Sequence, residues 1–342
     1  MRAVSLGHAG ILINSGESRI LCDPWFVPAF FGSWFVFPRN DQLSKNLLTE
    51  IESPTHLYIS HIHGDHLDEA FLAKHVSREV VVLLPDFPSH ELERRLSVLG
   101  FKNFLKTKNG QEAAIDSCTK IAIHVETSIT DGPGGDSALV VSDGETRLVN
   151  QNDCRTGDLE ALLKHGPVDL HWLQYSGAIW YPMVYEDNDE TKRKLAKAKI
   201  ESQFARALKY VETLNARAVV PSAGPPCFLD ESLFHLNVIN GDEISIFPDQ
   251  REFLKRLKKI NRDSDILAIP GTVIDISPKT ISVTHPENIN VEKIYTDKEQ
   301  YLREYQTDWA DWLVVEKQRW AIAPTNLIST LSVWFEPLMA LA

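Results

Sequence analysis

A run of histidines directly after an apolar, strand-like segment constrains this chain more than any other feature. Residues 58–66 read Tyr-Ile-Ser-His-Ile-His-Gly-Asp-His, and within six positions they hold four side chains of the kinds that bind metals: His61, His63, Asp65 and His66. Alternate residues of an extended chain point to the same side, so the first three can converge on one point, and the chain must turn to bring in the fourth. Imidazole and carboxylate ligands favour zinc or iron over calcium or magnesium.

The same run indicates a site for two metal ions. An exposed loop that happens to be rich in histidine is the simpler alternative, but such loops seldom keep this order directly after a buried strand. Four protein ligands are more than one catalytic metal usually takes from so short a segment. Two metals therefore fit better, with further ligands from elsewhere in the chain.

Three later residues are candidates for those further ligands. Asp153 follows a strand-like segment, where a carboxylate can give one oxygen to each of two metals; its alternative role is to cap the helix after it. His124 and Glu126 alternate on a predicted strand and so face the same side. Either could be the ligand between the histidine run and Asp153, and a structural role is the alternative for both.

Two residues near the start are expected to support the ligands rather than to bind metal. His8 lies in the first predicted strand, where a place beside the ligands or in the core is expected. Asp23 lies at the end of the second predicted strand and can orient a ligand histidine by accepting its second N–H.

Composition and charge exclude several classes of partner. The chain has 342 residues, enough for two domains, and its content of 43% hydrophobic and 24% charged residues is typical of a globular protein. A net charge of −12 argues against nucleic-acid backbones and anionic membrane surfaces as partners. No apolar run approaches the roughly 20 residues of a membrane span. The four cysteines show no paired spacing, so a reducing, cytoplasmic location is expected.

The order of the predicted elements indicates an α/β fold. Two strands, 3–13 and 18–22, are predicted to open the chain as a hairpin. Strands that come first and then alternate with helices are typical of a layered α/β protein. The pattern changes near residue 236, so residues 1–235 are predicted to form a metal-binding domain and residues 236–342 an accessory C-terminal region packed on it.

The motif H-x-H-x-D-H after a strand, followed by an aspartate at a later strand end, resembles the signature of the metallo-β-lactamase superfamily. In this chain the matching residues are His61, His63, Asp65, His66 and Asp153. The resemblance implies an αββα sandwich with the metals at one edge of the two packed sheets.

A narrower resemblance covers about residues 1–230. Blocks similar to those of the CMP-N-acetylneuraminate hydroxylase family follow one another in the same order, at 23–34, 58–67, 150–154, 181–183 and 221–224. Related enzymes hydroxylate the N-acetyl group of UDP-N-acetylmuramate. The resemblance implies oxygen-dependent hydroxylation of an N-acetyl to an N-glycolyl group on a nucleotide sugar, at a non-haem iron centre.

Two features depart from this pattern. Hydroxylases of the family carry a Rieske domain, which needs two cysteines and two histidines at close spacing. This chain shows no such set, so a separate Rieske or ferredoxin electron donor is expected. Hydrolases of the superfamily usually place a late histidine on the second metal. No later histidine lies in a convincing loop, which argues against a standard zinc hydrolase; these residues are His165, His171, His235 and His285.

Two enzyme functions therefore compete. The favoured one is a monooxygenase with two iron ions that hydroxylates an N-acyl or nucleotide-linked sugar. The aromatic loop 25–37, with Trp34, and the segment 175–185, with Tyr175 and Tyr181, would then line a dry substrate pocket. Either Arg155 or the basic helix start at 192–199 would hold a phosphate. The alternative is a zinc hydrolase of a phosphodiester, lactone or amide, in which Asp65 helps to orient the attacking water. A binding module without catalysis is the third hypothesis, which the complete first motif disfavours.

Overall fold

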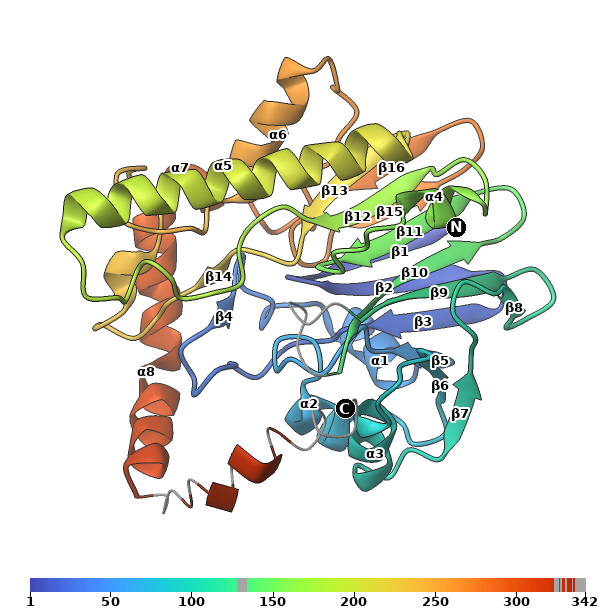
Figure 1. Ribbon diagram of the computed structural model, residues 1–342, viewed down its shortest axis with the longest axis horizontal. Helices are drawn as coiled ribbons and strands as arrows, with labels where there is room; N and C mark the ends of the chain where they lie inside the picture. Colours follow the sequence, from blue (N-terminus) through green and yellow to red (C-terminus); the bar gives the residue numbers. More distant parts are fainter. Residues whose placement is uncertain (128–133, 323–325, 327, 330, 334, 336–342) are drawn as a thin grey trace.

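Two β-sheets packed face to face, with helices on both outer faces, form the body of the molecule (Figure 1). The computed structural model describes the chain except for residues 128–133, 323–325, 327, 330, 334 and 336–342. The first sheet is covered by α1 (Lys45–Glu52), α2 (Glu69–His75) and α3 (Glu91–Val98). The second is covered by α4 (Leu159–Leu163), α5 (Asp189–Leu214) and α6 (Gln250–Lys259). The predicted αββα sandwich is confirmed.

The two sheets differ in the number and the order of their strands. The first has eight strands, in the spatial order β16 (Ile281–Thr284), β15 (Val273–Ile276), β1 (Arg2–Gly7), β2 (Gly10–Ser15), β3 (Ser18–Cys22), β5 (His56–Tyr58), β6 (Val81–Leu84) and β7 (Asn103–Lys106). The second has six, in the order β13 (Ala218–Ser222), β12 (Leu170–Gln174), β11 (Arg147–Asn152), β10 (Asp136–Ser142), β9 (Lys120–Glu126) and β8 (Ala113–Ala114). A small separate pair joins β4 (Phe35–Val36) to β14 (Pro226–Cys227).

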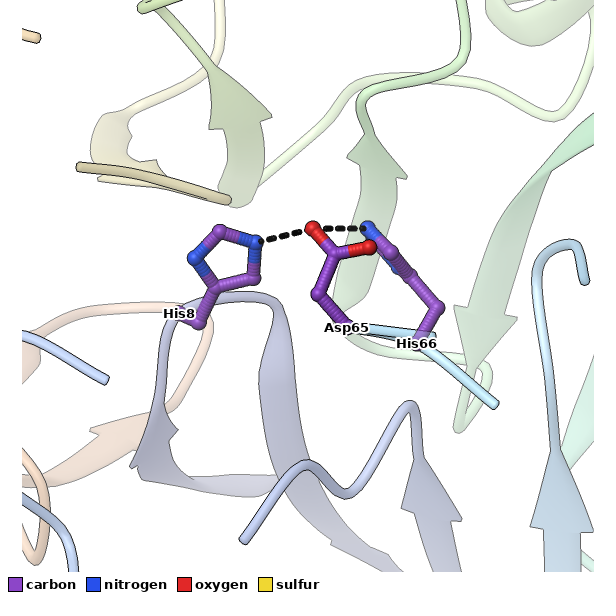
Figure 2. A group of neighbouring side chains, drawn as sticks. All are labelled: His8, Asp65 and His66. Carbon is purple, nitrogen blue, oxygen red and sulfur yellow. Dashed lines mark hydrogen bonds and ion pairs between the residues drawn. The ribbon is translucent and has the colours of Figure 1, made fainter. Parts of the chain in front are cut away.

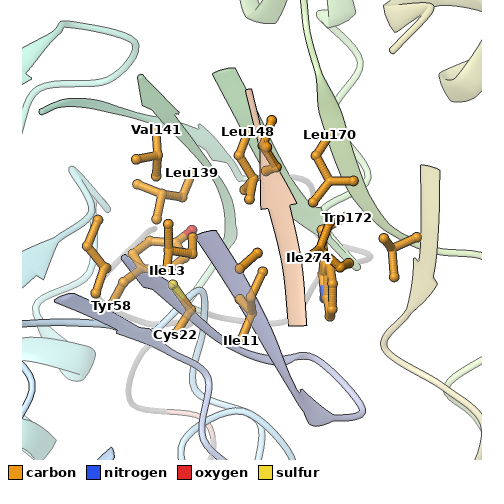
Figure 3. Close-up of a cluster of buried hydrophobic side chains, with 14 of the residues drawn as sticks. Ile11, Ile13, Cys22, Tyr58, Leu139, Val141, Leu148, Leu170, Trp172 and Ile274 are labelled. Atoms are coloured by element: carbon orange, nitrogen blue, oxygen red, sulfur yellow. The ribbon is translucent and has the colours of Figure 1, made fainter. Parts of the chain in front are cut away.

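The main core lies between the sheets. Buried side chains from both inner faces meet there, among them Ile11, Ile13 and Cys22 from the first sheet and Leu139, Val141 and Trp172 from the second (Figure 3). Strand residues alternate between faces, so Ala138 and Val140 point the other way and pack under the helices of the outer layer. Each large apolar side chain buried in this way contributes about 1.5–3 kcal/mol.

The start of the chain differs from its prediction, because residues 3–13 do not form one strand. Gly7 and His8 adopt left-handed backbone conformations, with φ of 93° and 52°. The chain reverses there, and Gly7 pairs with Gly10 at the end of two antiparallel strands, β1 and β2. His8 therefore lies in a tight turn at the edge of the sheet rather than within a strand.

The residues beyond 236 build onto the sandwich. β15 pairs with β1 and so extends the first sheet. Two further helices, α7 (Val291–Thr296) and α8 (Lys298–Ile322), contact the β4–β14 pair through aromatic side chains that meet Phe35 and Phe37. The predicted division of the chain at residue 235 stays a prediction. Among the described residues, no helix combines the length and the apolar character needed to cross a membrane.

One edge of the sandwich collects the loops that carry the predicted site. β3 and β5 run parallel and end at this edge, and β11 ends there while its antiparallel partner β10 begins there. The two sheets are joined at the same place. The Tyr58 hydroxyl donates to the Ser137 carbonyl at 2.9 Å, and the Ser137 hydroxyl donates to the Ser60 carbonyl at 2.8 Å.

Candidate metal centre

The histidine run leaves β5 and folds back on itself at this edge. The backbone N–H groups of His66 and Leu67 both donate to the carbonyl of His63, at 3.0 and 2.8 Å. This turn brings the ring of His66 beside that of His61, with 4.1 Å between the ring centroids. The reversal that the sequence required at His66 is therefore present.

Two overlapping groups of side chains have the geometry of metal-binding sites. One consists of His61, His66 and Asp153, the other of His8, Asp65 and His66 (Figure 2), and in each group the candidate ligand atoms lie within 4.8 Å of one another. His66 Nε2 is 3.3 Å from Asp153 Oδ1, and His61 Nε2 is 3.9 Å from Asp153 Oδ2. Two ligands of one ion are about 3.0–3.4 Å apart at usual metal–ligand distances. Asp153 thus directs one oxygen toward each histidine.

His63 extends the first group toward solvent. Its Nδ1 lies 2.8 Å from Nε2 of His61. Burial and the neighbouring His61 ring lower the pKa of His63 to about 4. The ring is therefore neutral at physiological pH, which is the form of histidine that binds metals.

The buried polar atoms at the centre fit a metal ion. Within the described part of the chain, His66 Nε2 and Asp153 Oδ1 are buried and make no hydrogen bond. Such orphaned atoms are rare in folded proteins, and each calls for an explanation. Burial opposes protonation of His66, but Asp153 and Asp65 outweigh it and raise its pKa. The same carboxylates would attract metal cations.

Carboxylates on the far side of the rings hold both central histidines in place. Asp23 Oδ2 lies 3.3 Å from Nδ1 of His66, and Asp136 Oδ1 lies 3.3 Å from Nδ1 of His61. The hydroxyl of Ser60 lies between the two rings, 3.0 Å from Nδ1 of His61 and 3.3 Å from Nδ1 of His66. With Nδ1 occupied in each ring, Nε2 is left for a metal. Asp23 thus lies beside a ring nitrogen of His66, and its role in orienting a metal ligand stays a prediction.

The two residues expected to provide the middle ligand are not brought to this cluster. His124 Nε2 faces His165 Nε2 at 2.8 Å, and Glu126 accepts a hydrogen bond from the backbone of Gly157 at 3.1 Å. The carboxylate that reaches the cluster between the histidine run and Asp153 is Asp136, which the sequence reasoning missed.

A signal for Asp136 was present in the sequence, because strand-like segments at 137–142 and 146–150 are joined by the turn residues Ser-Asp-Gly at 142–144 and predict a hairpin. Strands 137–142 and 146–150 pair with Ser142 opposite Arg147 and Leu139 opposite Asn150. β10 begins at Asp136 and β11 ends at Asn152, one residue before Asp153, so the open end of the hairpin lies at the edge of the sheet that carries both carboxylates. The residues at the two open ends of a predicted hairpin can therefore be expected at one edge.

His8, which the sequence analysis expected to support the ligands, belongs to one of the two candidate ligand groups, and it reaches them from a turn rather than from a strand. Its Nε2 is 3.1 Å from Asp65 Oδ2, and its ring meets that of His66 edge-on at 5.7 Å (Figure 2). The later histidines discussed above, His165, His171, His235 and His285, belong to neither of the two groups.

The four predicted substrate residues have different surroundings. Trp34 is buried against Phe30 and pairs with Ala29, whose Cβ lies 3.7 Å from where a Cβ on Gly64 of the histidine run would be. Tyr181 is 40% exposed. Arg155 is half-buried, two residues beyond Asp153. Tyr175 is fully buried and its hydroxyl donates to the carbonyl of Pro248 at 2.9 Å, so it is closed to a substrate.

Comparison with known proteins places the chain in a family. No family model matches it. It is 43% identical over 345 residues to the "Putative Rieske 2Fe-2S iron-sulfur protein" of Mycolicibacterium smegmatis, covering 99% of this chain and 66% of that protein. A protein of the same name from Mycobacterium tuberculosis is 43% identical over 347 residues, with 67% of its length covered. The chain therefore spans about two thirds of these relatives.

The chain is also similar, at lower identity, to an enzyme of named activity. The cytidine monophosphate-N-acetylneuraminic acid hydroxylase of Danio rerio is 25% identical over 315 residues, which cover 88% of this chain and 49% of the enzyme. The blocks that suggested this resemblance are thus part of an alignment that spans most of the chain.

Solved structures agree on the fold. The metallo-β-lactamase fold protein YhfI from Bacillus subtilis matches with a TM-score of 0.50 and 14% identity, over 80% of this chain and 99% of that one. A mutant of the CmlA β-hydroxylase matches with a TM-score of 0.50 and 17% identity, over 80% of this chain and 54% of that one. The chain therefore belongs to the metallo-β-lactamase fold superfamily, in the family of the mycobacterial proteins and related to the cytidine monophosphate-N-acetylneuraminic acid hydroxylases.

Proposed function

We propose that this chain carries the dinuclear metal centre of a non-haem iron monooxygenase that hydroxylates an N-acyl or nucleotide-linked sugar. The observation that carries the proposal is the 43% identity, over 99% of the chain, to proteins named for a Rieske 2Fe-2S cluster. Such clusters transfer electrons. A monooxygenase needs an electron pair to reduce one atom of O₂ to water, whereas a hydrolase needs none. A Rieske protein or a ferredoxin is the electron donor that fits.

The residues of the cluster divide naturally between two ions. His61, His63 and Asp153 would hold the first, and His66, Asp65, Asp153 and His8 the second. Two bound iron ions would supply O₂ activation, which no amino-acid side chain provides. In this assignment Asp65 is a metal ligand, and His8, which was expected only to support the ligands, is the fourth donor of the second ion.

The task of the remaining residues is to hold the rings and to keep water out. Asp23 and Asp136 accept from Nδ1 of His66 and His61, which fixes the Nε2 atoms in the direction of the metals. The loop of Trp34 packs against the histidine run and would shield the reacting acyl group from solvent. Tyr181, exposed on a neighbouring loop, is the further aromatic residue available to a sugar ring.

The proposal includes a cytoplasmic location and a small-molecule substrate. In support, none of the four cysteines, all of which lie in the described part of the chain, forms a disulfide, and Cys118 is exposed as a thiol, which suits a reducing compartment. The net charge of −12 supports neither a nucleic acid nor an anionic membrane as partner.

The test is metal content followed by turnover. The protein is expressed in medium that contains iron and zinc, and metals are counted in the purified chain. We expect two iron ions per chain, and an O₂-dependent gain of one oxygen atom, detected by mass spectrometry, when CMP- or UDP-linked N-acetyl sugars are supplied with a reduced ferredoxin. Two zinc ions together with cleavage of a phosphodiester in the absence of O₂ would replace this proposal with the hydrolase.

A further inference from the structure

The last residue of β11 is a buried asparagine in an uncommon backbone conformation. Asn152 comes directly before Asp153 and is 1% exposed. Its φ of 56° lies in the left-handed region, which asparagine adopts more readily than most residues other than glycine. The pairing of β11 with β12 shifts register at the same point, between Asn150 and Asn152. Such irregularities re-aim side chains, and here the amide of Asn152 reaches Asp23, directly after β3 of the other sheet.

The amide of Asn152 lies against the carboxylate that approaches His66. Its Nδ2 donates to Oδ2 of Asp23, the oxygen that also lies 3.3 Å from Nδ1 of His66. Oδ1 of the same carboxylate accepts from the backbone N–H of Ser60 at 2.7 Å. Because an ionised carboxylate only accepts hydrogen bonds, the atom of Asn152 that faces it is the nitrogen. The orientation of the amide is therefore fixed by its partner.

This orientation leaves the other end of the amide without a partner. Within the described part of the chain, Oδ1 of Asn152 is buried and makes no hydrogen bond. An unpaired buried acceptor raises the free energy of the folded state. A side chain that served only to stabilise the end of β11 would gain little from such an arrangement. What the amide nitrogen does to Asp23 explains the residue better.

The amide weakens the bond between Asp23 and the ring of His66. The charge of one carboxylate oxygen is divided between two donors, the amide of Asn152 and the Nδ1 proton of His66. The ring nitrogen lies 3.3 Å from that oxygen, whereas a charge-assisted hydrogen bond is usually about 2.7–2.9 Å long. The carboxylate therefore orients the ring but holds its proton only loosely.

The other central ring has the same arrangement, with a backbone donor in place of the amide. The backbone N–H of Ser137 donates at 2.6 Å to Oδ1 of Asp136, the oxygen that lies 3.3 Å from Nδ1 of His61. A main-chain donor cannot be removed by replacing a side chain. The amide of Asn152 can be removed, so the contribution of the second donor can be tested there.

We propose that Asn152 is a positioning residue that limits how strongly Asp23 draws the Nδ1 proton of His66, and so limits the electron density that Nε2 offers to a metal. A histidine whose second nitrogen is held more weakly is a less basic ligand. A less basic ligand binds a metal ion less tightly and favours the reduced form of iron. This last consequence rests on the proposed function, which needs iron that reacts with O₂. The effect on affinity does not, because zinc binds the same nitrogen.

The first experiment measures metal affinity. Asn152→Gly removes the amide and keeps the left-handed backbone, which glycine adopts without strain. In competition with a chelator, the full chain with this substitution should bind zinc at least about threefold more tightly than the wild type. A purely structural role for Asn152 has the opposite sign, so weaker or unchanged binding would overturn the proposal. Asn215→Gly, at an exposed position with a φ of 43°, is the matched control and should leave the zinc affinity unchanged.

A double substitution shows whether the effect passes through Asp23. Asp23→Asn removes the charge that the amide shares with the ring. In that background Asn152→Gly should add nothing to the zinc affinity, because the two residues act as one unit. A gain of the same size with and without Asp23 would mean that the amide acts elsewhere, and the proposal would be rejected.

Nuclear magnetic resonance reads the same hydrogen bond in the wild type. In the zinc-loaded chain, labelled with ¹⁵N at histidine, the Nδ1–H signal of His66 is identified as the one that Asp23→Asn moves. It should lie where ordinary ring N–H groups do, and Asn152→Gly should move it downfield as the bond to Asp23 strengthens. A strongly downfield signal in the wild type would overturn the proposal, whether or not the variant folds.

These measurements keep the role of Asn152 separate from the proposed function. A purified protein that holds two zinc ions and cleaves a phosphodiester would refute the monooxygenase, and tighter zinc binding by Asn152→Gly would still support the role of the amide. Iron and O₂-dependent turnover, with no change in zinc affinity or in the ring signal, would refute the role of Asn152 alone.

Discussion

The hydroxyl of Ser60 lies between two imidazole rings and contacts the nitrogen of each ring that points away from Asp153. Behind that hydroxyl, Asp23 and Asp136 approach the same two nitrogens. The candidate centre therefore repeats one arrangement twice. In each copy a carboxylate lies against Nδ1 of a histidine ring, and Nε2 of that ring is left for a metal. The orienting carboxylates should matter to metal binding although neither of them belongs to the two candidate ligand groups.

Replacement of these carboxylates tests that role. Asp23→Asn and Asp136→Asn keep the shape of the side chain but weaken its hold on the Nδ1 proton, and each should lower metal affinity about 10–100-fold. The measurement is a competition between the protein and a chelator of known affinity. Asp263→Asn, at an exposed position, is the control and should behave as the wild type. Unchanged affinity in both variants would show that the rings are held by packing alone.

A second pair of variants compares the predicted and the observed positions of the ligands. His63→Ala removes a ring whose Nδ1 lies 2.8 Å from Nε2 of His61, so metal stoichiometry should fall. His124→Ala removes a ring that contacts His165 instead, and the metal content should stay at the wild-type value. Loss of metal from His124→Ala would instead show that His124 takes part in metal binding.

The sequence indicated the candidate ligands of the histidine run because they are close together in the chain, and it missed Asp136 because that residue is not. His61, His63, Asp65 and His66 lie within six positions, so their convergence follows from the geometry of a strand and one turn. Asp136 reaches His61 only through the pairing of β10 with β11 and the packing of one sheet on the other.

At the scale of elements, the turn between β1 and β2 decides where His8 lies. Gly7 has a φ of 93°, and a Cβ there would lie 2.6 Å from Cγ1 of Val36 and 3.0 Å from Cγ of Pro270. An alternating pattern over residues 3–13 predicts a continuous strand, because periodicity is insensitive to a reversal that only glycine permits. The apolar pattern of residues 190–214 predicts a long helix, and α5 occupies Asp189–Leu214, because such a pattern repeats over several turns. Two-residue strands such as β4 depend wholly on their partners.

Alanine substitutions at two turns, β1–β2 and β10–β11, separate the cost of backbone strain from the cost of a steric clash. Gly144→Ala places alanine at a φ of 88° with nothing within 4 Å of its Cβ, so it should cost about 1–2 kcal/mol of stability. Gly7→Ala meets the same strain and also a clash, so it should lower the free energy of unfolding by about 1–3 kcal/mol more. It should also lower metal affinity, because it displaces His8. Denaturant unfolding measures both changes. Equal losses of stability in the two variants would mean that Val36 and Pro270 can move aside without an energetic cost.

β12 carries a histidine that should make the fold sensitive to acid. His171 Nε2 lies 2.8 Å from Oε1 of Gln151, whose amide donates to the carbonyl of Cys154 at 3.0 Å. Burial and the charge of Arg262 lower the pKa of His171 to about 3. In the unfolded chain its pKa is about 6.5. The unfolded state therefore binds the proton first, and stability is complete above pH 6.5 and falls toward pH 3.

The slope of that loss approaches about 1.4 kcal/mol for each pH unit. His171→Gln cannot take up the proton, so its thermal midpoint should fall less between pH 7.5 and pH 5 than that of the wild type. Acid release of metals contributes to both proteins alike, and the comparison is between slopes rather than absolute midpoints. Identical slopes would show that His171 is protonated in the folded state.

At the scale of the whole molecule, the centre is a seam between two sheets. His8, Asp23 and the histidine run come from the first sheet, and Asp136 and Asp153 from the second. The sequence alone predicted layered α/β structure, and the family resemblance supplied the sandwich. The sheet order was not predicted, because the pairing of β15 with β1 joins residues at opposite ends of the chain and leaves no local pattern.

Removal of the metals should therefore weaken the assembly of the whole molecule. Buried carboxylates that face each other across the seam lose their counter-ions when a chelator is added. A ligand that binds only the folded state stabilises it by mass action, so the thermal midpoint should fall by about 5 °C or more and recover when iron or zinc is returned. Calorimetry in the presence and absence of chelator provides the measurement. An unchanged midpoint would show that neither ion spans the two sheets.

The link from Tyr58 through Ser137 to Ser60 has a consequence for how the protein is made. These three residues connect the strand that leads into the histidine run with the strand that begins at Asp136. Neither sheet alone contains a complete set of candidate ligands, so the centre cannot be loaded until the chain has been synthesised past Asp153 and the second sheet has docked on the first. Metal capture is then a late event in maturation, and a chain that holds both ions is one that has finished assembling.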